Sequence, residues 1–128
     1  MNLTPLLGKE NHVPGCVLRV AGPSFAPEKC VQAFPNSSIS ARGGGLNINV
    51  SDCDGDDVPG QTKEAEAFLR RHEALIRDML SANGIRACLD FGVWQKEVPV
   101  QYVRVPASLA ELAGRLGLEI EISIYAAR

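Results

Sequence analysis

Residues 118–126, LEIEISIYA, alternate apolar and polar side chains more strictly than any other stretch of the sequence. The apolar members, which would share one face of a strand, are Leu118, Ile120, Ile122 and Ile124. The polar members, which would share the opposite face, are Glu119, Glu121, Ser123 and Tyr125. Because successive side chains of a strand point to opposite sides, this pattern predicts a half-buried strand with its isoleucines facing inward.

The same alternation recurs in earlier segments. Residues 46–51, LNINVS, alternate strictly, and residues 16–22 and 86–94 are also rich in strand-forming side chains. We expect residues 98–105, VPVQYVRV, to form a hairpin with 86–94, at an edge or with a bulge because of Pro99. The sequence therefore predicts five strands with one apolar and one polar face.

Three segments have helical patterns. Residues 24–34 begin with Ser24 as a cap and end before a proline, and residues 107–117 form a short apolar-periodic stretch. Residues 61–84 carry one apolar stripe at helical spacing, which includes His72. We predict an α+β ferredoxin-like open sandwich in the order β-α-β-α-β-β-α-β, with a mainly antiparallel five-stranded sheet and its helices on one face.

The length of 128 residues fits one domain with one core. Residues 1–14 contain two prolines and lack periodicity, so we expect a loosely ordered N-terminal arm. Residues 15–128 form the predicted single α+β domain. Between its first helix and the strand at 46–51, residues 36–45 read as a polar loop ending in three glycines.

Charge is concentrated in one short stretch. The whole chain carries −2, which argues against a strongly basic nucleic-acid binder. Residues 52–66 hold six acids and one lysine, so they carry −5 and the rest of the chain +3. A local field of this sign attracts basic partners. The loop at its start could be a docking surface for such a partner or only a solvated strand-to-helix connection.

The four cysteines are widely separated and form no C-x-x-C pair. We predict no signal peptide, so we expect reduced thiols in a cytoplasmic protein. No apolar run approaches the length that spans a membrane, and we predict no membrane association.

No cofactor or metal is predicted. A calcium loop counted from Asp52 has Asp57 where glycine is required and Lys63 where a bidentate glutamate is required. The glycines at 43–45 lead into a strand instead of a helix N-terminus, which disfavours a phosphate loop.

No nucleophile elbow, Walker loop or dinucleotide fingerprint occurs in the chain. His72 invites a general-base reading, but its place in an apolar stripe favours a core or border histidine. We therefore expect a protein that is not an enzyme.

Two stretches resemble domain-of-unknown-function family 4279 of bacterial proteins. The first is LRVAGPSFAPEKCVQAF at 18–34, and the second is LAELAGRLGLEIEISIYA at 109–126. The resemblance covers roughly residues 15–126, but Leu46 and Ile48 stand where the family often has an aromatic strand. It implies no catalytic residue. Because some members are similar to immunity proteins encoded beside toxins, it implies an inhibitor-like binding role.

We thus predict a binding protein, immunity-like in type, that docks a protein partner such as a basic toxin. Its contacts would come from the acidic loop and the open sheet face, through Asp52, Asp54, Asp56, Asp57, Asn47, Asn49, Glu119, Glu121 and Tyr125. The alternative is a small-molecule-binding regulatory domain that uses a crevice between the open face and residues 43–45. A homodimer formed through the edge strand of the predicted hairpin stays open.

Overall fold

A computed structural model of the chain describes residues 15–40 and 44–126. The strands in these ranges are β1 (Cys16–Ala21), β2 (Ser37–Ile39), β3 (Gly45–Ser51), β4 (Arg86–Trp94) and β5 (Glu119–Tyr125). The helices are the 3-10 turn η1 (Pro27–Lys29) and the α-helices α2 (Val58–Arg71), α3 (Glu73–Met79) and α4 (Ala107–Leu116). The predicted arm at 1–14 lies outside the described residues.

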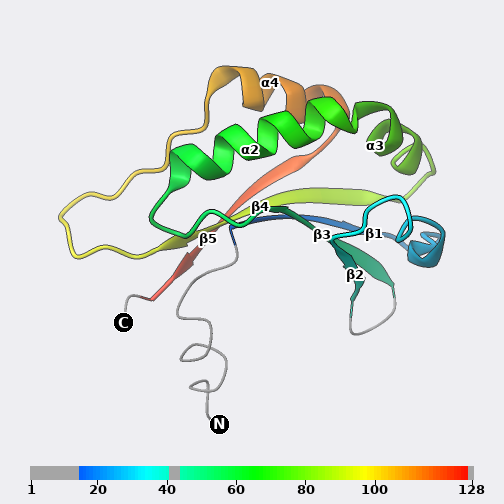
Figure 1. Cartoon of the computed structure of the whole chain (residues 1–128), viewed down its shortest axis with the longest axis horizontal. Coiled ribbons are helices and arrows are strands. Elements are labelled where there is room, and N and C mark those ends of the chain that lie inside the picture. Colours follow the sequence, from blue (N-terminus) through cyan, green and yellow to red (C-terminus); the bar gives the residue numbers. More distant parts are fainter. Residues whose placement is uncertain (1–14, 41–43, 127–128) are drawn as a thin grey trace, which may run out of the picture.

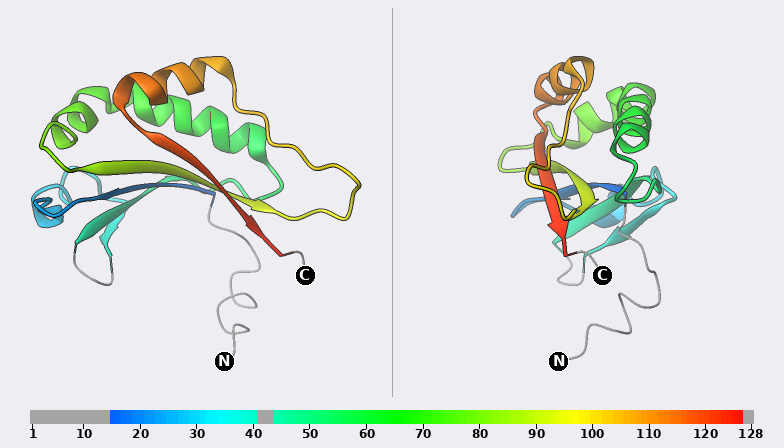
Figure 2. Two further views of the ribbon diagram at one scale, coloured as in Figure 1. Left: turned by 180° about the vertical axis from the view of Figure 1, so that it is seen from behind. Right: turned by 90° about the vertical axis from the view of Figure 1, so that its left-hand side faces the viewer.

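The described strands form one five-stranded sheet in the order β2-β3-β1-β4-β5. All neighbouring pairs are antiparallel except β4 and β5, which are parallel and connected through α4. Figures 1 and 2 show α2, α3 and α4 together on one side of the sheet. The α+β class and a mostly antiparallel sheet of five strands are therefore confirmed, whereas the ferredoxin-like order is not.

The core lies between the sheet and the helices. Its fully buried sheet residues include Leu18, Leu89 and Phe91, and its helix residues include Leu69 and Leu112. Burial of such side chains supplies the main favourable free energy of folding. The opposite face of the sheet carries the polar residues of β1, β3, β4 and β5, and none of the three described α-helices packs on it (Figure 2).

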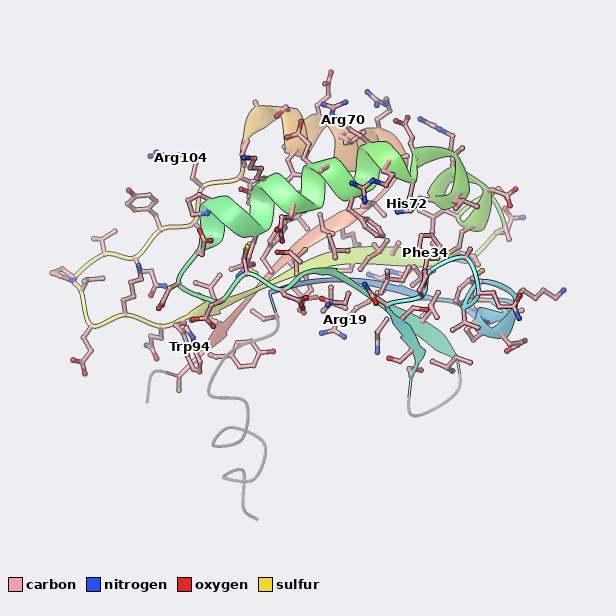
Figure 3. The ribbon with its side chains drawn as sticks, in the orientation of Figure 1. Arg19, Phe34, Arg70, His72, Trp94 and Arg104 are labelled. Atoms are coloured by element: carbon pink, nitrogen blue, oxygen red, sulfur yellow. The ribbon has the colours of Figure 1, made fainter. Side chains whose placement is uncertain are left out.

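The predicted helix over 61–84 is two helices. Asp57 caps the start of α2 by accepting a hydrogen bond from the Gly60 N–H at 3.0 Å. α2 ends at Arg71, and the backbone angles of His72, φ −110° and ψ 21°, interrupt the helix before α3 begins. The His72 ring lies 4.5 Å from the ring of Phe68 and 5.5 Å from that of Phe34, centroid to centroid. His72 is thus a half-buried member of an aromatic cluster at the border of the core (Figure 3).

Two predictions between β1 and β3 were wrong. The segment 24–34 forms only the three-residue turn η1 in place of a helix. The predicted loop 36–45 contains β2, which pairs with β3. Phe34 is buried in the core, so tertiary packing overrides the local helical pattern of this segment.

The predicted hairpin strand at 98–105 was also wrong. β4 has β1 on one side and β5 on the other, so no edge of β4 is left for a hairpin partner. Residues 95–106, the crossover segment, run instead without ladder pairing from β4 to α4. They bend at 97–99 and turn back toward α4 as an extended stretch (Figure 1). The predicted order β-α-β-α-β-β-α-β is accordingly incorrect, because this strand is absent, the first helix is only η1, and β2 is added.

β5 is less buried than its alternation predicts. Leu118, just before the strand, is buried, and Ile122 packs partly against the core. Ile120 and Ile124 lie on the same face but are exposed. The reason is topological, since β5 is the edge strand of the sheet and the helices do not cover its full length.

Candidate functional site

The acidic loop, residues 52–57, connects β3 to α2 and is fixed by its own aspartates. Asp52 accepts a hydrogen bond from the Asn49 amide at 2.6 Å, and the Asp54 carboxylate accepts one from the Trp94 indole at 3.4 Å. Asp57 is the cap of α2. Three of the four aspartates therefore position the loop, and Asp56 is left exposed with no hydrogen bond to the described residues.

The loop lies between two surfaces. Asp52, its first residue, is hydrogen-bonded to Asn49 on the open sheet face, whereas Asp56 lines a groove on the helix side. The described residues hold no group of three or more His, Cys, Asp or Glu side chains that could bind a metal ion. The loop's charge thus borders both faces of the sheet without forming a cation site in the described ranges.

The open sheet face is organised around Arg19 in β1 (Figure 3). Its guanidinium donates to the buried Asp90 carboxylate at 3.1 Å and to the Asn47 amide oxygen at 3.3 Å. Ser123 donates a hydrogen bond of 2.7 Å to the other oxygen of Asp90. The four side chains come from four strands, so this network ties the face together across the sheet.

The remaining predicted residues of the open face also lie on it. Asn49, Glu121 and Tyr125 stand opposite Val17, Asp90 and Trp94 in the strand registers, and opposing residues share a face. Glu119 forms an ion pair with Arg86 at 3.0 Å. A shallow hollow of about 240 Å³ borders this pair, with Arg19, Cys88 and Glu121 on its rim. The predicted same-face placement is confirmed, while a binding role stays a prediction.

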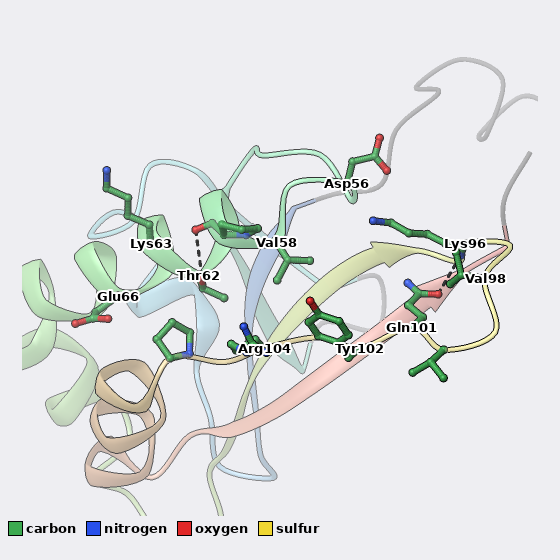
Figure 4. Close-up of a pocket in the computed structure, with 13 residues that line it drawn as sticks. Asp56, Val58, Thr62, Lys63, Glu66, Lys96, Val98, Gln101, Tyr102 and Arg104 are labelled. Atoms are coloured by element: carbon green, nitrogen blue, oxygen red, sulfur yellow. Dashed lines mark hydrogen bonds between the residues drawn. The ribbon is translucent and has the colours of Figure 1, made fainter.

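A recess lies on the helix side of the sheet, and Asp56 is the one predicted site residue that lines it. We call it the crossover groove, and it lies between the start of α2 and the crossover segment (Figure 4). Its volume is about 710 Å³. Its apolar walls are formed by Val58, Pro59, Val98, Val100, Tyr102 and Pro106.

Apolar side chains of the crossover segment face water in this groove. Val100 is 76% exposed and Tyr102 is 72% exposed. Along this extended segment the odd-numbered Val103 and Val105 are half-buried, so the even-numbered side chains are the ones presented outward. Gln101 holds the base of the segment by donating to the Trp94 carbonyl at 2.8 Å. The groove is therefore open and largely apolar, and a hydrogen bond from Gln101 anchors the crossover segment to the end of β4.

The charges of the groove are mostly cationic. Lys63, Lys96 and Arg104 line it, and none of the three has a carboxylate within ion-pair distance among the described residues. Arg104 lies 5.2 Å above the centre of the Tyr102 ring. The Glu66 carboxylate already accepts hydrogen bonds from Ser108 and Arg70, and these bonds hold its pKa below the usual value.

The sequence carried one signal for this groove. The apolar alternation of 98–105 was interpreted as strand pairing, yet Pro99 removes a ladder donor and marks a segment poorly suited to a hairpin. The crevice predicted beside residues 43–45 stays a prediction, because residue 43 lies outside the described part of the chain.

The four thiols are unfavourable nucleophiles. Burial raises the pKa of Cys16 far above its usual value, and the pKa values of Cys30 and Cys53 are also raised. For Cys88, burial and a hydrogen bond to Glu121 raise the pKa to about 12. Because the thiolate is the reactive form, these cysteines stay protonated near neutral pH.

This environment predicts the effect of Glu121→Gln on Cys88. Loss of the carboxylate lowers the pKa of Cys88, so alkylation by iodoacetamide at pH 8 should accelerate by at least about threefold, since the thiolate fraction rises. Peptide-resolved mass spectrometry after timed alkylation measures the rate. Glu119→Gln is the matched control with a smaller expected effect, because Glu119 acts on Cys88 only through its charge. Equal rates in wild type and Glu121→Gln would contradict this account.

No family model, curated protein or solved structure matches the chain. The resemblance to family 4279 therefore stays a prediction. Among the described residues, no helix is both long enough and apolar enough to cross a membrane.

Proposed function

We propose that the chain is a non-catalytic binding protein that docks a partner protein by holding an extended segment of that partner in the crossover groove. The observation that carries the proposal is the set of apolar side chains that the crossover segment presents to water opposite α2. Exposed apolar surface of this kind is typical of interaction sites.

The openness of the groove favours a protein segment over an enclosed ligand. Small-molecule sites bury most of their ligand, whereas Val100 and Tyr102 are more than two-thirds exposed. Main-chain groups of the crossover segment between Glu97 and Val105 have no backbone hydrogen bonds among the described residues. An extended peptide can therefore add main-chain hydrogen bonds to its apolar contacts, as in strand addition.

Charge complementarity sets the chemistry of that segment. Lys63, Lys96 and Arg104 call for acidic side chains beside the apolar ones. The acidic loop adjoins the groove through Asp56, so basic side chains elsewhere on the partner can meet the loop. The resemblance to family 4279 supports a narrower proposal, in which the partner is a basic toxin inhibited by occupation of its surface.

A peptide display library of random sequence, panned against the full-length chain, tests the proposal. We expect enrichment of peptides that combine apolar and acidic residues. Tyr102→Ala should weaken binding of the synthesised peptides by at least about tenfold in fluorescence anisotropy, because exposed tyrosines are frequent binding hot spots. Lys96→Glu should also weaken binding of these peptides, and its effect should be larger at low salt than at high salt, because salt screens the charges.

Leu75→Ala is the matched control, since Leu75 is an exposed apolar residue of α3 away from the groove. It should leave peptide affinity unchanged. Absence of enrichment, or equal loss in the Tyr102→Ala and Leu75→Ala variants, would sink the proposal.

The second candidate is a small-molecule-binding regulatory domain. A groove of about 710 Å³ falls within the usual size of small-molecule sites, and its apolar walls with three cations fit an amphipathic organic anion. Thermal-shift screening with such anions separates the two. Stabilisation abolished by Tyr102→Ala, with no peptide enrichment, would favour this candidate.

A further inference from the structure

β5 offers a free strand edge. It pairs with β4 along all seven of its residues, and no described strand pairs with its other side. The strand contains no proline, and its register with β4 runs without a bulge. The opposite edge strand, β2, is only three residues long. Short edges resist pairing with other chains, whereas long regular ones favour it, so β5 is the edge suited to pairing.

Apolar side chains flank this edge on the helix side. Ile120 is 37% exposed and Ile124 is 59% exposed, and both lie on the face that is buried elsewhere in the sheet. An exposed edge strand with apolar side chains gains both main-chain hydrogen bonds and apolar burial when another strand joins it.

The sequence of β5 is complementary to itself in one antiparallel register. When two copies pair about Ile122, each Ile120 faces an Ile124 of the other copy. On the open face, Glu119 then faces Tyr125, and Glu121 faces Ser123. All seven residues pair, and no glutamate opposes another.

Several other registers lose this match. Parallel in-register pairing would place Glu119 opposite Glu119 and Glu121 opposite Glu121, and like charges directly opposite destabilise a sheet. An antiparallel register about Ile120 opposes Glu119 to Glu121. A register about Ser123 avoids glutamate pairs but pairs Ile120 with Ala126, beyond the strand. A shift by one residue would turn the isoleucines to the polar face.

We propose that β5 is a self-association edge, at which two copies of this chain pair antiparallel about a two-fold axis through Ile122. The two five-stranded sheets then form one continuous sheet. A two-fold interface of this kind uses the same surface on both subunits. The inference does not rest on the proposed binding function, because none of the residues lining the crossover groove belongs to β5.

Sedimentation velocity of the full-length chain between about 10 µM and about 1 mM tests the proposal. We expect a monomer–dimer equilibrium in the wild type. The double variant Ile120→Lys/Ile124→Lys should raise the dissociation constant at least about tenfold, because it places cations along the edge. Val100→Lys, which adds a cation to another exposed apolar site, is the control and should leave the equilibrium unchanged. Circular dichroism checks that each variant is folded.

Two substitutions of Tyr125, one cationic and one anionic, test the register itself. Tyr125→Lys brings a cation opposite Glu119 of the other copy, and Tyr125→Glu brings an anion there. Both variants lose the same packing of Tyr125 against Trp94, whose ring centroids are 6.5 Å apart. The lysine variant should dimerise at least about fivefold more tightly at low salt, because each dimer contains two such pairs.

Three results would overturn the proposal. The first is a monomer at every concentration. The second is a dimer that the β5 double variant leaves intact. The third is a dimer disrupted by Val100→Lys, which would locate the interface on the crossover segment. Equal affinities of the two Tyr125 variants would refute the register about Ile122.

Discussion

Replacing Phe91 with alanine is expected to lower the free energy of unfolding by about 3–5 kcal/mol, the usual cost of truncating a fully buried phenylalanine. Phe91 has no exposed surface and lies in β4, between β1 and β5 under the helices. Truncation removes its contacts and leaves a cavity that the surrounding strands can fill only in part. Because domains have a total stability of about 5–15 kcal/mol, the variant should lose much of its stability. Urea denaturation followed by circular dichroism measures the change.

Two further variants serve as references for this result. Phe91→Leu keeps most of the volume and should cost less than about 2 kcal/mol. Val100→Ala removes an exposed apolar side chain and should change stability by no more than about 0.5 kcal/mol. If Phe91→Ala cost no more than Val100→Ala, the core would not be centred on the helix side of β4.

The faces of the sheet could be predicted because alternation reports directly on which side of a strand is buried. The pattern of β3 and β5 placed Asn47 and Glu121 on the open face, and the registers with β1 and β4 confirm that placement. Alternation does not report which strands become neighbours. β5 was therefore expected to be fully covered on one side, although its edge position leaves Ile124 exposed.

The errors in the fold came from segments whose local pattern lost to tertiary structure. Residues 98–105 have the composition of a strand, but β5 occupies the place beside β4 that a hairpin partner would need. The helix at 61–84 was correct in its amphipathic face, but its break at His72 was missed, and the His72 ring packs against Phe34, which lies outside that segment. Such contacts cannot be read from one segment alone.

The candidate site was only partly predictable for the same reason. The charge of the acidic loop is visible in the sequence. The structural roles of Asp54 and Asp57 become clear only when their hydrogen-bond donors, Trp94 and Gly60, are located. The crossover groove depends on two segments that are about forty residues apart, so no local pattern indicates it.

Gln61 connects three parts of the structure at the start of α2. Its side chain has no exposed surface, and its amide nitrogen donates to the Asp54 carbonyl at 3.0 Å and to the Gly92 carbonyl at 2.8 Å. The amide oxygen of Gln61 has no partner among the described residues. The helix, the acidic loop and β4 are thus connected by one buried amide group.

Replacing Gln61 with glutamate should lower the free energy of unfolding by about 3–5 kcal/mol at pH 7, the range found when a buried charge has no partner. The new carboxylate would face two carbonyl oxygens where the amide donated two hydrogen bonds. Gln61→Met, a neutral variant of similar length, should cost only about 1–3 kcal/mol, because it removes the two hydrogen bonds that the buried amide donates without adding charge. Chemical denaturation of the three proteins under identical buffer conditions measures both losses.

The pH dependence separates the effect of charge from the effect of shape. Burial raises the pKa of the introduced carboxyl in the folded state above its unfolded value of about 4.3. The folded protein then binds the proton more tightly, so the deficit is small below the unfolded pKa and grows as pH rises through the folded one. Gln61→Met has no added titratable group, and its deficit should not change over that range. A Gln61→Glu deficit that is constant from pH 4 to pH 7 would show that water reaches the carboxylate and that the junction of α2, the loop and β4 is open.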